Sequence, residues 1–212
     1  MLNILLIDDH AVVRSGMKLI LDEAFSPVEF GEAADSVQAL TKLRQQKWDL
    51  VLLDISLPDA SGVQVLKKIQ IHDPMLPVLV LSNYPESQYA VRLLRAGAAG
   101  YLSKDSDEDE IIKAVRQACN GRKYISDAVA ELLACQLKRP EIASENRHEM
   151  LSNREYEIFL ELAEGNRVTD IADKLSISSK TVSTHRARIF QKMNFPNNAG
   201  LVIYASENSL RG

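Results

Sequence analysis

Short apolar runs alternate with segments of helical periodicity through the first 120 residues. The runs predict strands at 3–8, 28–33, 49–54, 78–82 and 100–103, and the helical pattern predicts helices at 11–24, 36–46, 61–72, 87–96 and 107–120. Continuous apolar runs separated by helices are typical of parallel strands that are buried on both faces. Five repeats of strand and helix therefore predict an α/β doubly wound fold with a five-stranded parallel sheet.

The pattern changes after residue 120. One further helix is predicted at 126–137, and the polar stretch that follows it contains Pro140 and has no apolar period, so we interpret residues 121–148 as an exposed linker with one helix. The remaining pattern is helical throughout, at about 152–164, 168–175, 179–193 and 197–206. The sequence thus predicts an α/β domain over residues 1–120, the linker, and a small all-α domain over 149–212.

Polar residues that resemble helix caps support these helix starts. Ser152 and Glu155 have the spacing of a capping box, and Ser178 can cap the helix at 179–193. The helix at 168–175 has no obvious cap, and Asn166 is the best candidate.

Polar side chains stand where the apolar runs of the first domain end. Asp8 and Asp9 close the first run, Asp54 closes the third, Ser82 ends the fourth, and Lys104 follows the fifth. In an open parallel sheet the carboxyl ends of the strands form the ligand crevice. We therefore expect these five side chains to gather at one edge of the sheet.

The chemistry of this set indicates phosphoryl transfer. At separations of about 5 Å and an effective dielectric of ~20, each pair of ionised carboxylates repels by roughly 3 kcal/mol, so the cluster needs a cation or raised pKa values. Carboxylate oxygens suit Mg²⁺, which also recruits phosphate oxygens, and a lysine adds a point charge for the phosphoryl group. A carboxylate that faces a metal and a phosphate donor can form an aspartyl phosphate. Acidic residues at strand ends are also common helix caps, and Asp9 alone fits that reading, but the full set in one crevice favours a functional site.

Charge and cysteine content add two expectations. The net charge of −4 does not suggest nucleic-acid binding by the whole chain, yet Lys174 to Ser206 holds five basic residues and no acidic one. Cys119 and Cys135 are expected to be reduced, partly buried thiols. The first apolar run is far too short for a signal sequence or membrane span, so we expect a cytoplasmic protein with no membrane partner.

The basic segment is centred on the predicted helix at 179–193. Val182, Ile189, Phe190 and Met193 can turn to a core, which leaves small, polar and cationic side chains on the other side. Such a face allows close approach to base edges while its cations reach phosphates. The preceding short helix and tight turn complete a helix-turn-helix, which favours DNA binding over the alternative of a solvated basic face on a helical bundle.

The first domain resembles the receiver domain of two-component response regulators. Four stretches together carry the resemblance: Ile7-Asp8-Asp9-His10, residues 53–62 (LDISLPDASG), Leu81-Ser82, and residues 96–104 (AGAAGYLSK). The resemblance implies a flavodoxin-like sheet and phosphorylation of Asp54 by a sensor histidine kinase. It implies Mg²⁺ ligands in Asp9, Asp54 and the main-chain carbonyl of Ser56, with Asp8 behind them. It further implies that Lys104 contacts the phosphoryl group and that Ser82 and Tyr101 form a switch pair.

Residues 149–212 resemble the LuxR-type DNA-binding domain. The matching stretches are residues 151–155 (LSNRE), 171–175 (IADKL) and 179–185 (SKTVSTH), and the whole chain is similar to NarL/FixJ-type response regulators. Carried over to this sequence, the base-facing positions are Ser183, Thr184 and Ala187, and the phosphate or groove candidates are Lys180, His185, Arg188 and Lys192. The resemblance implies a homodimer in the active state that reads paired half-sites of double-stranded DNA.

Two other classes of protein stay open at this point. The chain could be a phosphoryl-accepting interaction protein whose helical domain binds a protein partner, although the basic face argues against it. It could also be a phosphatase of the haloacid-dehalogenase type, but that family has an Asp-x-Asp pattern after its first strand, whereas Asp8 and Asp9 are adjacent and the candidate nucleophile Asp54 lies on the third strand. We therefore expect a regulator and not an enzyme.

Overall fold

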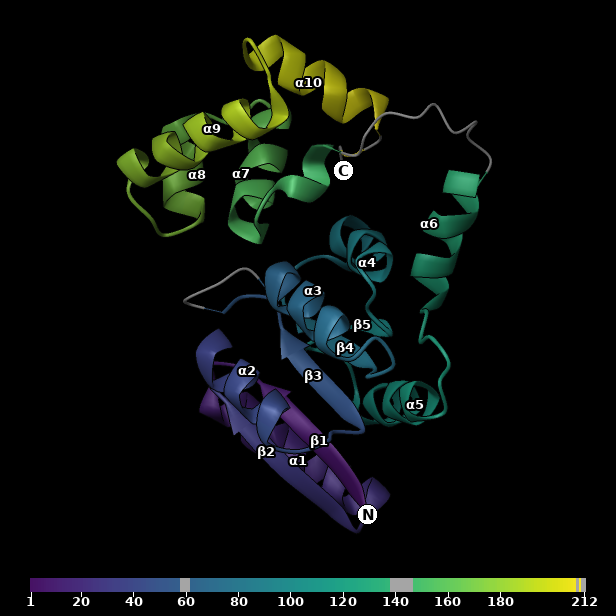
Figure 1. The fold of residues 1–212 in the computed structure, drawn as a ribbon. Coiled ribbons are helices and arrows are strands. Elements are labelled where there is room, and N and C mark those ends of the chain that lie inside the picture. Colours follow the sequence, from purple (N-terminus) through teal and green to yellow (C-terminus); the bar gives the residue numbers. More distant parts are fainter. Residues whose placement is uncertain (58–61, 138–146, 209, 211–212) are drawn as a thin grey trace. The chain divides into compact units, whose positions relative to one another are not determined.

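The computed structural model divides the chain into two compact units, residues 1–140 and 141–212 (Figure 1). The structure describes residues 1–57, 62–137, 147–208 and 210, so Pro58 and most of the polar segment around Pro140 lie outside the described residues. Within the described part of the chain, no helix is both long enough and apolar enough to cross a membrane.

The first unit contains a five-stranded parallel sheet in the order β2-β1-β3-β4-β5. Its strands are β1 (Leu2–Ile7), β2 (Val28–Ala33), β3 (Leu50–Asp54), β4 (Val78–Ser82) and β5 (Gly100–Ser103). This is the predicted flavodoxin-like, doubly wound arrangement. The strand order reverses between β1 and β3, and a crevice therefore opens at the carboxyl ends of these two strands.

Helices cover both faces of the sheet, which explains why the strand sequences are apolar throughout. The helices are α1 (Ala11–Phe25), α2 (Ser36–Gln45), α3 (Gly62–His72), α4 (Glu86–Arg95) and α5 (Glu108–Cys119). Figure 1 shows α1 and α5 on one face and α2, α3 and α4 on the other. Because successive strand side chains point to opposite faces, Leu50 and Leu52 join the core under α1 and α5, while Val51 and Leu53 are buried on the opposite face.

The segment after α5 is attached to the same unit. The Tyr124 amide donates to the carbonyl of Ala99 at 2.7 Å, and the helix α6 (Asp127–Leu137) packs against α4. The Ser126 hydroxyl donates to Glu86 Oε1 at 2.7 Å and ties the start of α6 to the start of α4. The helix that we assigned to the linker is therefore part of the first compact unit. At the end of α5, Cys119 is a free thiol as predicted, but it is exposed and not partly buried.

The second unit consists of helices. They are a 3-10 turn η1 (Arg147–Met150), α7 (Asn153–Ala163), α8 (Val168–Lys174), α9 (Ser179–Met193) and α10 (Asn198–Glu207). The capping box of Ser152 and Glu155 and the cap by Ser178 are both present as predicted. The predicted cap of α8 is wrong: the capping position is Arg167, which makes no side-chain cap bond. The side-chain amide of Asn166 instead points back toward α7 and donates to Glu161 Oε2 at 2.8 Å.

Gly62 starts α3 at a point where the backbone folds closely over β3. A Cβ at this position would lie 2.3 Å from the Ile55 Cα, next to the end of β3. We expect Gly62→Ala to lower the free energy of unfolding by about 2 kcal/mol, because main-chain atoms must shift to relieve the overlap. Urea unfolding followed by fluorescence of Trp48, the single tryptophan, measures this.

Gly16 provides the matched control for Gly62. Nothing lies within 4 Å of a Cβ added to Gly16 on the exposed side of α1, so Gly16→Ala should stabilise the unit by up to about 1 kcal/mol. Equal effects at the two glycines would show that close packing at Gly62 is unimportant.

Candidate functional site

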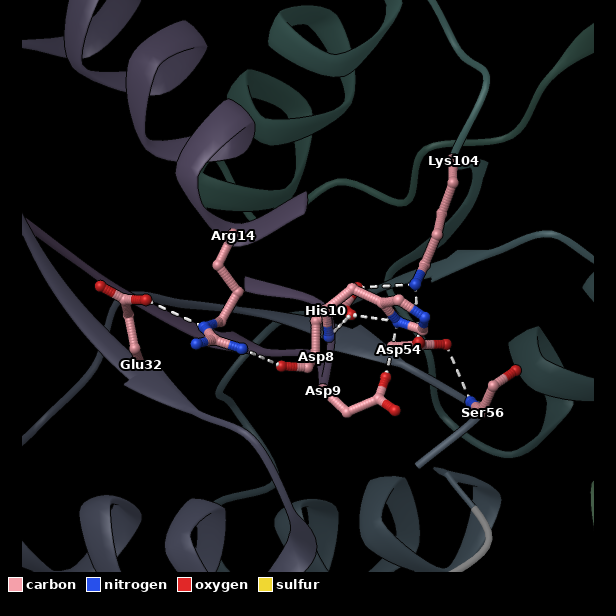
Figure 2. Close-up of polar contacts among 8 residues, drawn as sticks. All are labelled: Asp8, Asp9, His10, Arg14, Glu32, Asp54, Ser56 and Lys104. Carbon is pink, nitrogen blue, oxygen red and sulfur yellow. Dashed lines mark hydrogen bonds and ion pairs between the residues drawn. The ribbon is translucent and has the colours of Figure 1, made fainter. Parts of the chain in front are cut away.

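The carboxyl ends of β1, β3 and β5 bring Asp8, Asp54 and Lys104 into direct contact. Figure 2 shows the Lys104 ammonium between the two carboxylates, with Nζ 2.7 Å from Asp8 Oδ2 and 2.7 Å from Asp54 Oδ2. Asp54 is fully buried and Asp8 nearly so, at 0% and 3% exposure. A single cation thus compensates two carboxylates in a buried pocket.

The surroundings of Asp54 hold its carboxylate in one orientation. The Ser56 amide donates to Oδ1 at 2.8 Å while Lys104 donates to Oδ2. Burial raises the pKa of Asp54, although Lys104 and the Ser56 amide counteract part of this effect. For Lys104, burial alone would lower the pKa, but the hydrogen bonds to Asp54 and Asp8 outweigh it and raise the pKa, so the ammonium stays charged.

The acidic residues fit a divalent cation. Asp8, Asp9, His10 and Asp54 each place one ligand atom within 4.8 Å of all the others. Asp8 already accepts from the His10 amide at 2.8 Å and pairs with Lys104, whereas the Asp9 side chain is one-third exposed at the mouth of the pocket. Of these carboxylates Asp9 is therefore the most accessible to a hard cation such as Mg²⁺.

Ser82 and Tyr101 both bind the backbone of Tyr84, just after β4. The fully buried Ser82 hydroxyl accepts from the Tyr84 amide at 3.1 Å. The Tyr101 hydroxyl donates to the Tyr84 carbonyl at 2.6 Å, and its ring is buried. Burial raises the pKa of Tyr101 to about 12, so its hydroxyl remains a hydrogen-bond donor at neutral pH. The two residues of the predicted switch pair thus meet at one peptide segment.

Sequence reasoning missed four residues at or beside the pocket. The Arg14 guanidinium donates to the main-chain carbonyl of Asp8 at 2.6 Å and to Glu32 Oε2 at 2.9 Å, as Figure 2 shows. Lys18 also pairs with Glu32. The sequence contains little sign of these contacts, because the pairing of α1 side chains with Glu32 can be predicted only when the register of β1 against β2 is known.

The fourth missed residue is His10, which directly follows the two aspartates. Its ring Nδ1 lies 2.7 Å from Asp9 Oδ1 and 3.2 Å from Asp8 Oδ1. Its position next to Asp9 in the sequence was a usable signal for this contact.

The helix α9 of the second unit presents most of the predicted DNA contacts on one exposed face. Val182, Ile189 and Met193 are buried, and Phe190 is partly exposed. The exposed members of the predicted set are Lys180, Ser183, Thr184, Ala187, Arg188 and Lys192. No acidic residue lies on α9, so this face carries only positive charge.

Two of the predicted contacts are tied to the body of the unit, Lys192 by an ion pair and His185 by partial burial. The Lys192 ammonium lies 2.6 Å from Oε2 of the buried Glu155 on α7. His185 is partly buried, and burial lowers its pKa, so its imidazole is neutral at pH 7. His185 is therefore suited to hydrogen bonding in a groove and not to neutralising a phosphate.

Comparison with known proteins covers almost the whole chain. Residues 4–116 match the response regulator receiver domain, and residues 149–205 match the family of bacterial regulatory proteins called the luxR family. The chain is 33% identical over 210 residues to response regulator UvrY of Escherichia coli, covering 99% of this chain and 96% of UvrY. It is also 33% identical over 210 residues to response regulator GacA of Pseudomonas aeruginosa, covering 99% and 98%.

Solved structures agree with this assignment. The RcsB response regulator of Salmonella typhimurium matches with a TM-score of 0.59 and 27% identity over 97% of this chain and 98% of RcsB. A structure of two RcsB dimers bound to two parallel DNAs matches with a TM-score of 0.60 at 27% identity, over 97% and 98%. The two domain matches and the full-length relatives together show that the chain belongs to the NarL/FixJ-type two-component response regulators, with a receiver domain followed by a LuxR-type helix-turn-helix domain.

Proposed function

We propose that this response regulator accepts a phosphoryl group on Asp54 from a sensor histidine kinase and then regulates transcription through α9. The observation that carries the proposal is the buried Asp54 carboxylate, held by Lys104 and the Ser56 amide at the edge of an acidic pocket. A carboxylate held in one orientation is suited to attack phosphorus, and the neighbouring lysine can neutralise the charge of the phosphorylated product.

In the proposed step, an Asp54 oxygen forms a bond to phosphorus while the bond from phosphorus to the kinase's imidazole nitrogen breaks. Asp9, Asp54 and the main-chain carbonyl of Ser56 would hold Mg²⁺, which when bound neutralises charge on the phosphoryl oxygens. Asp8 holds Lys104 in place behind them. Lys104 and the Ser82 hydroxyl then donate to the new phosphoryl oxygens.

Phosphorylation changes the contacts that hold the segment after β4. The Ser82 hydroxyl accepts from the Tyr84 amide, and donating to a phosphoryl oxygen would draw Ser82 and this segment toward Asp54. Tyr101 binds the carbonyl of the same Tyr84 and would have to follow. A local change of charge is thereby transmitted to the segment that leads into α4.

The DNA-binding part of the proposal uses the exposed face of α9. Ser183, Thr184 and Ala187 are small enough to let the helix approach base edges, and Lys180 and Arg188 can reach phosphates. Lys192 would have to leave its pair with Glu155 to do the same. His185 is assigned to a groove contact as a neutral donor or acceptor. RcsB dimers bind DNA, and by analogy we propose a homodimer that reads two half-sites.

Footprinting on genomic DNA, with and without acetyl phosphate, tests the function. We expect discrete protected sites that fill at lower protein concentration when acetyl phosphate is present. Binding should weaken steeply with salt, and Arg188→Ala should reduce the slope of log K against log salt by about 1 per subunit.

Arg122→Ala removes the same charge from an exposed position in the first unit and should leave the slope unchanged. If no DNA is protected under any condition, the alternative reading gains support, in which the phosphorylated chain acts through a protein partner.

A further inference from the structure

The imidazole of His10 lies against the carboxylates that we propose as the metal site. Its Nδ1 is 2.7 Å from Asp9 Oδ1 and 3.2 Å from Asp8 Oδ1, and the ring is held there by its own backbone, because the His10 amide donates to Asp8 at 2.8 Å. Figure 2 shows the ring over the same pocket that Asp54 and Lys104 enter. A nitrogen atom is thus added to a donor set that otherwise consists of oxygen.

The spacing of these atoms suits neighbouring ligands of one small cation. Two ligands at right angles around an ion, each about 2.1 Å from it, are separated by about 3.0 Å. The distances from His10 Nδ1 to the two carboxylates lie on either side of this value. The ligand atom of Asp54 also lies within 4.8 Å of the others.

Nitrogen as a ligand changes which metals are favoured. Mg²⁺ prefers an all-oxygen site, whereas imidazole suits first-row transition metals, Zn²⁺, Cu²⁺, Fe²⁺ and Ni²⁺ more than Mn²⁺. We propose that His10 is a nitrogen ligand of the receiver metal site and that the pocket takes a divalent transition cation, of which Mn²⁺ is the simplest probe, more tightly than its carboxylates alone would. The inference rests on the proposed function in that it uses the same metal site.

Mn²⁺ binding to the full-length protein tests His10 directly. Pulsed electron paramagnetic resonance of the Mn²⁺ complex should show coupling to an imidazole nitrogen, and His10→Gln should remove this coupling. Titration calorimetry should show that His10→Gln weakens Mn²⁺ binding by about tenfold, which is the lower end of the loss seen when a supporting group of a metal site is removed. Mg²⁺ binding should change by less than about twofold. His72→Gln, on the exposed end of α3, is the matched control and should alter neither.

Two results would overturn the inference, and they differ in what they mean for the proposed function. If His10→Gln keeps the nitrogen coupling and the Mn²⁺ affinity, while Asp9→Asn abolishes binding of both cations, the metal site stands and His10 serves only as a hydrogen-bond partner of Asp9. If Asp9→Asn also leaves both cations bound as before, the pocket is not the metal site, and that part of the proposed function fails with the inference.

Discussion

Asp54→Asn should abolish phosphoryl uptake from acetyl phosphate and, at pH 8, make the first unit harder to unfold by about 1 kcal/mol. Uptake is lost because an amide oxygen is a poor nucleophile. Stability rises because asparagine keeps the shape of Asp54 without a fully buried charge, while Lys104 retains Asp8 as its partner. Incorporation of labelled phosphate and urea unfolding without divalent cations, followed by Trp48 fluorescence, measure the two effects.

The stability effect of Asp54 has a definite dependence on pH. Burial raises the pKa of Asp54 in the folded protein above its unfolded value, so its contribution to stability is fully present below the unfolded pKa and is lost as the pH rises through the folded pKa. The advantage of Asp54→Asn should therefore be largest at pH 8 and shrink as the pH falls toward the ordinary aspartate pKa of 3.8.

A matched control for Asp54 is Asp22→Asn on the exposed side of α1, which should change neither uptake nor stability. Labelling of Asp54→Asn at the wild-type rate would place the phosphoacceptor elsewhere. A variant less stable than wild type at pH 8 would mean that Lys104 more than compensates the burial of Asp54.

Glu155→Ala should destabilise the second unit by about 3 kcal/mol. Glu155 is 3% exposed, accepts from the Ser152 amide at 2.8 Å, and pairs with Lys192 on α9. Its removal therefore costs both part of a helix cap and one partner of an ion pair whose carboxylate is buried. Amide hydrogen exchange resolved over α7 and α9 should show the loss of protection, and DNA binding should weaken because α9 is no longer fixed against α7.

Glu155→Gln separates the charge from the hydrogen bonds. Burial alone would raise the pKa of Glu155, but Lys192 and the Ser152 amide outweigh it and hold the pKa below the usual value of 4.5. The carboxylate therefore stabilises the unit above pH 4.5 and loses this effect as the pH falls through the folded pKa. Glu155→Gln should therefore be less stable than wild type at neutral pH, and this difference in the free energy of unfolding should disappear in acid. The difference for Asp54→Asn also shrinks in acid, but there the variant is the more stable protein at high pH.

Glu207→Ala, an exposed change at the end of α10, should stay within about 0.5 kcal/mol of wild type. A difference between wild type and Glu155→Gln that is constant from pH 3 to pH 8 would contradict the assigned role of the charge.

The sequence predicted the elements well because each has a strong local signal. A strand such as β3 is one apolar run ended by Asp54, and the capping box of Ser152 and Glu155 marks the start of α7. The clustering of Asp8, Asp54 and Lys104 was also predictable, because parallel strands end at one edge. The individual chemical roles of these side chains stay predictions.

What the sequence did not predict depends on contacts between distant segments. Arg14 reaches Glu32 only because β1 and β2 pair in a particular register, and Lys192 pairs with Glu155 across 37 residues. The packing of α6 against α4 has the same origin, since an isolated amphipathic helix does not indicate which surface it covers. The wrong prediction at Asn166 has a local cause. Its spacing suited a cap of α8, but its side chain hydrogen-bonds to the nearby Glu161 instead.

The Tyr101 hydroxyl donates to a peptide oxygen, the main-chain carbonyl of Tyr84. Every amino acid at position 84 supplies that same oxygen as long as the main chain keeps its path. A mutational scan of position 84 would therefore leave this bond intact and miss it, whereas Tyr101→Phe deletes one oxygen atom and removes the bond. A genetic screen for residues of the switch would therefore identify Tyr101 but not position 84, which supplies its main-chain partner.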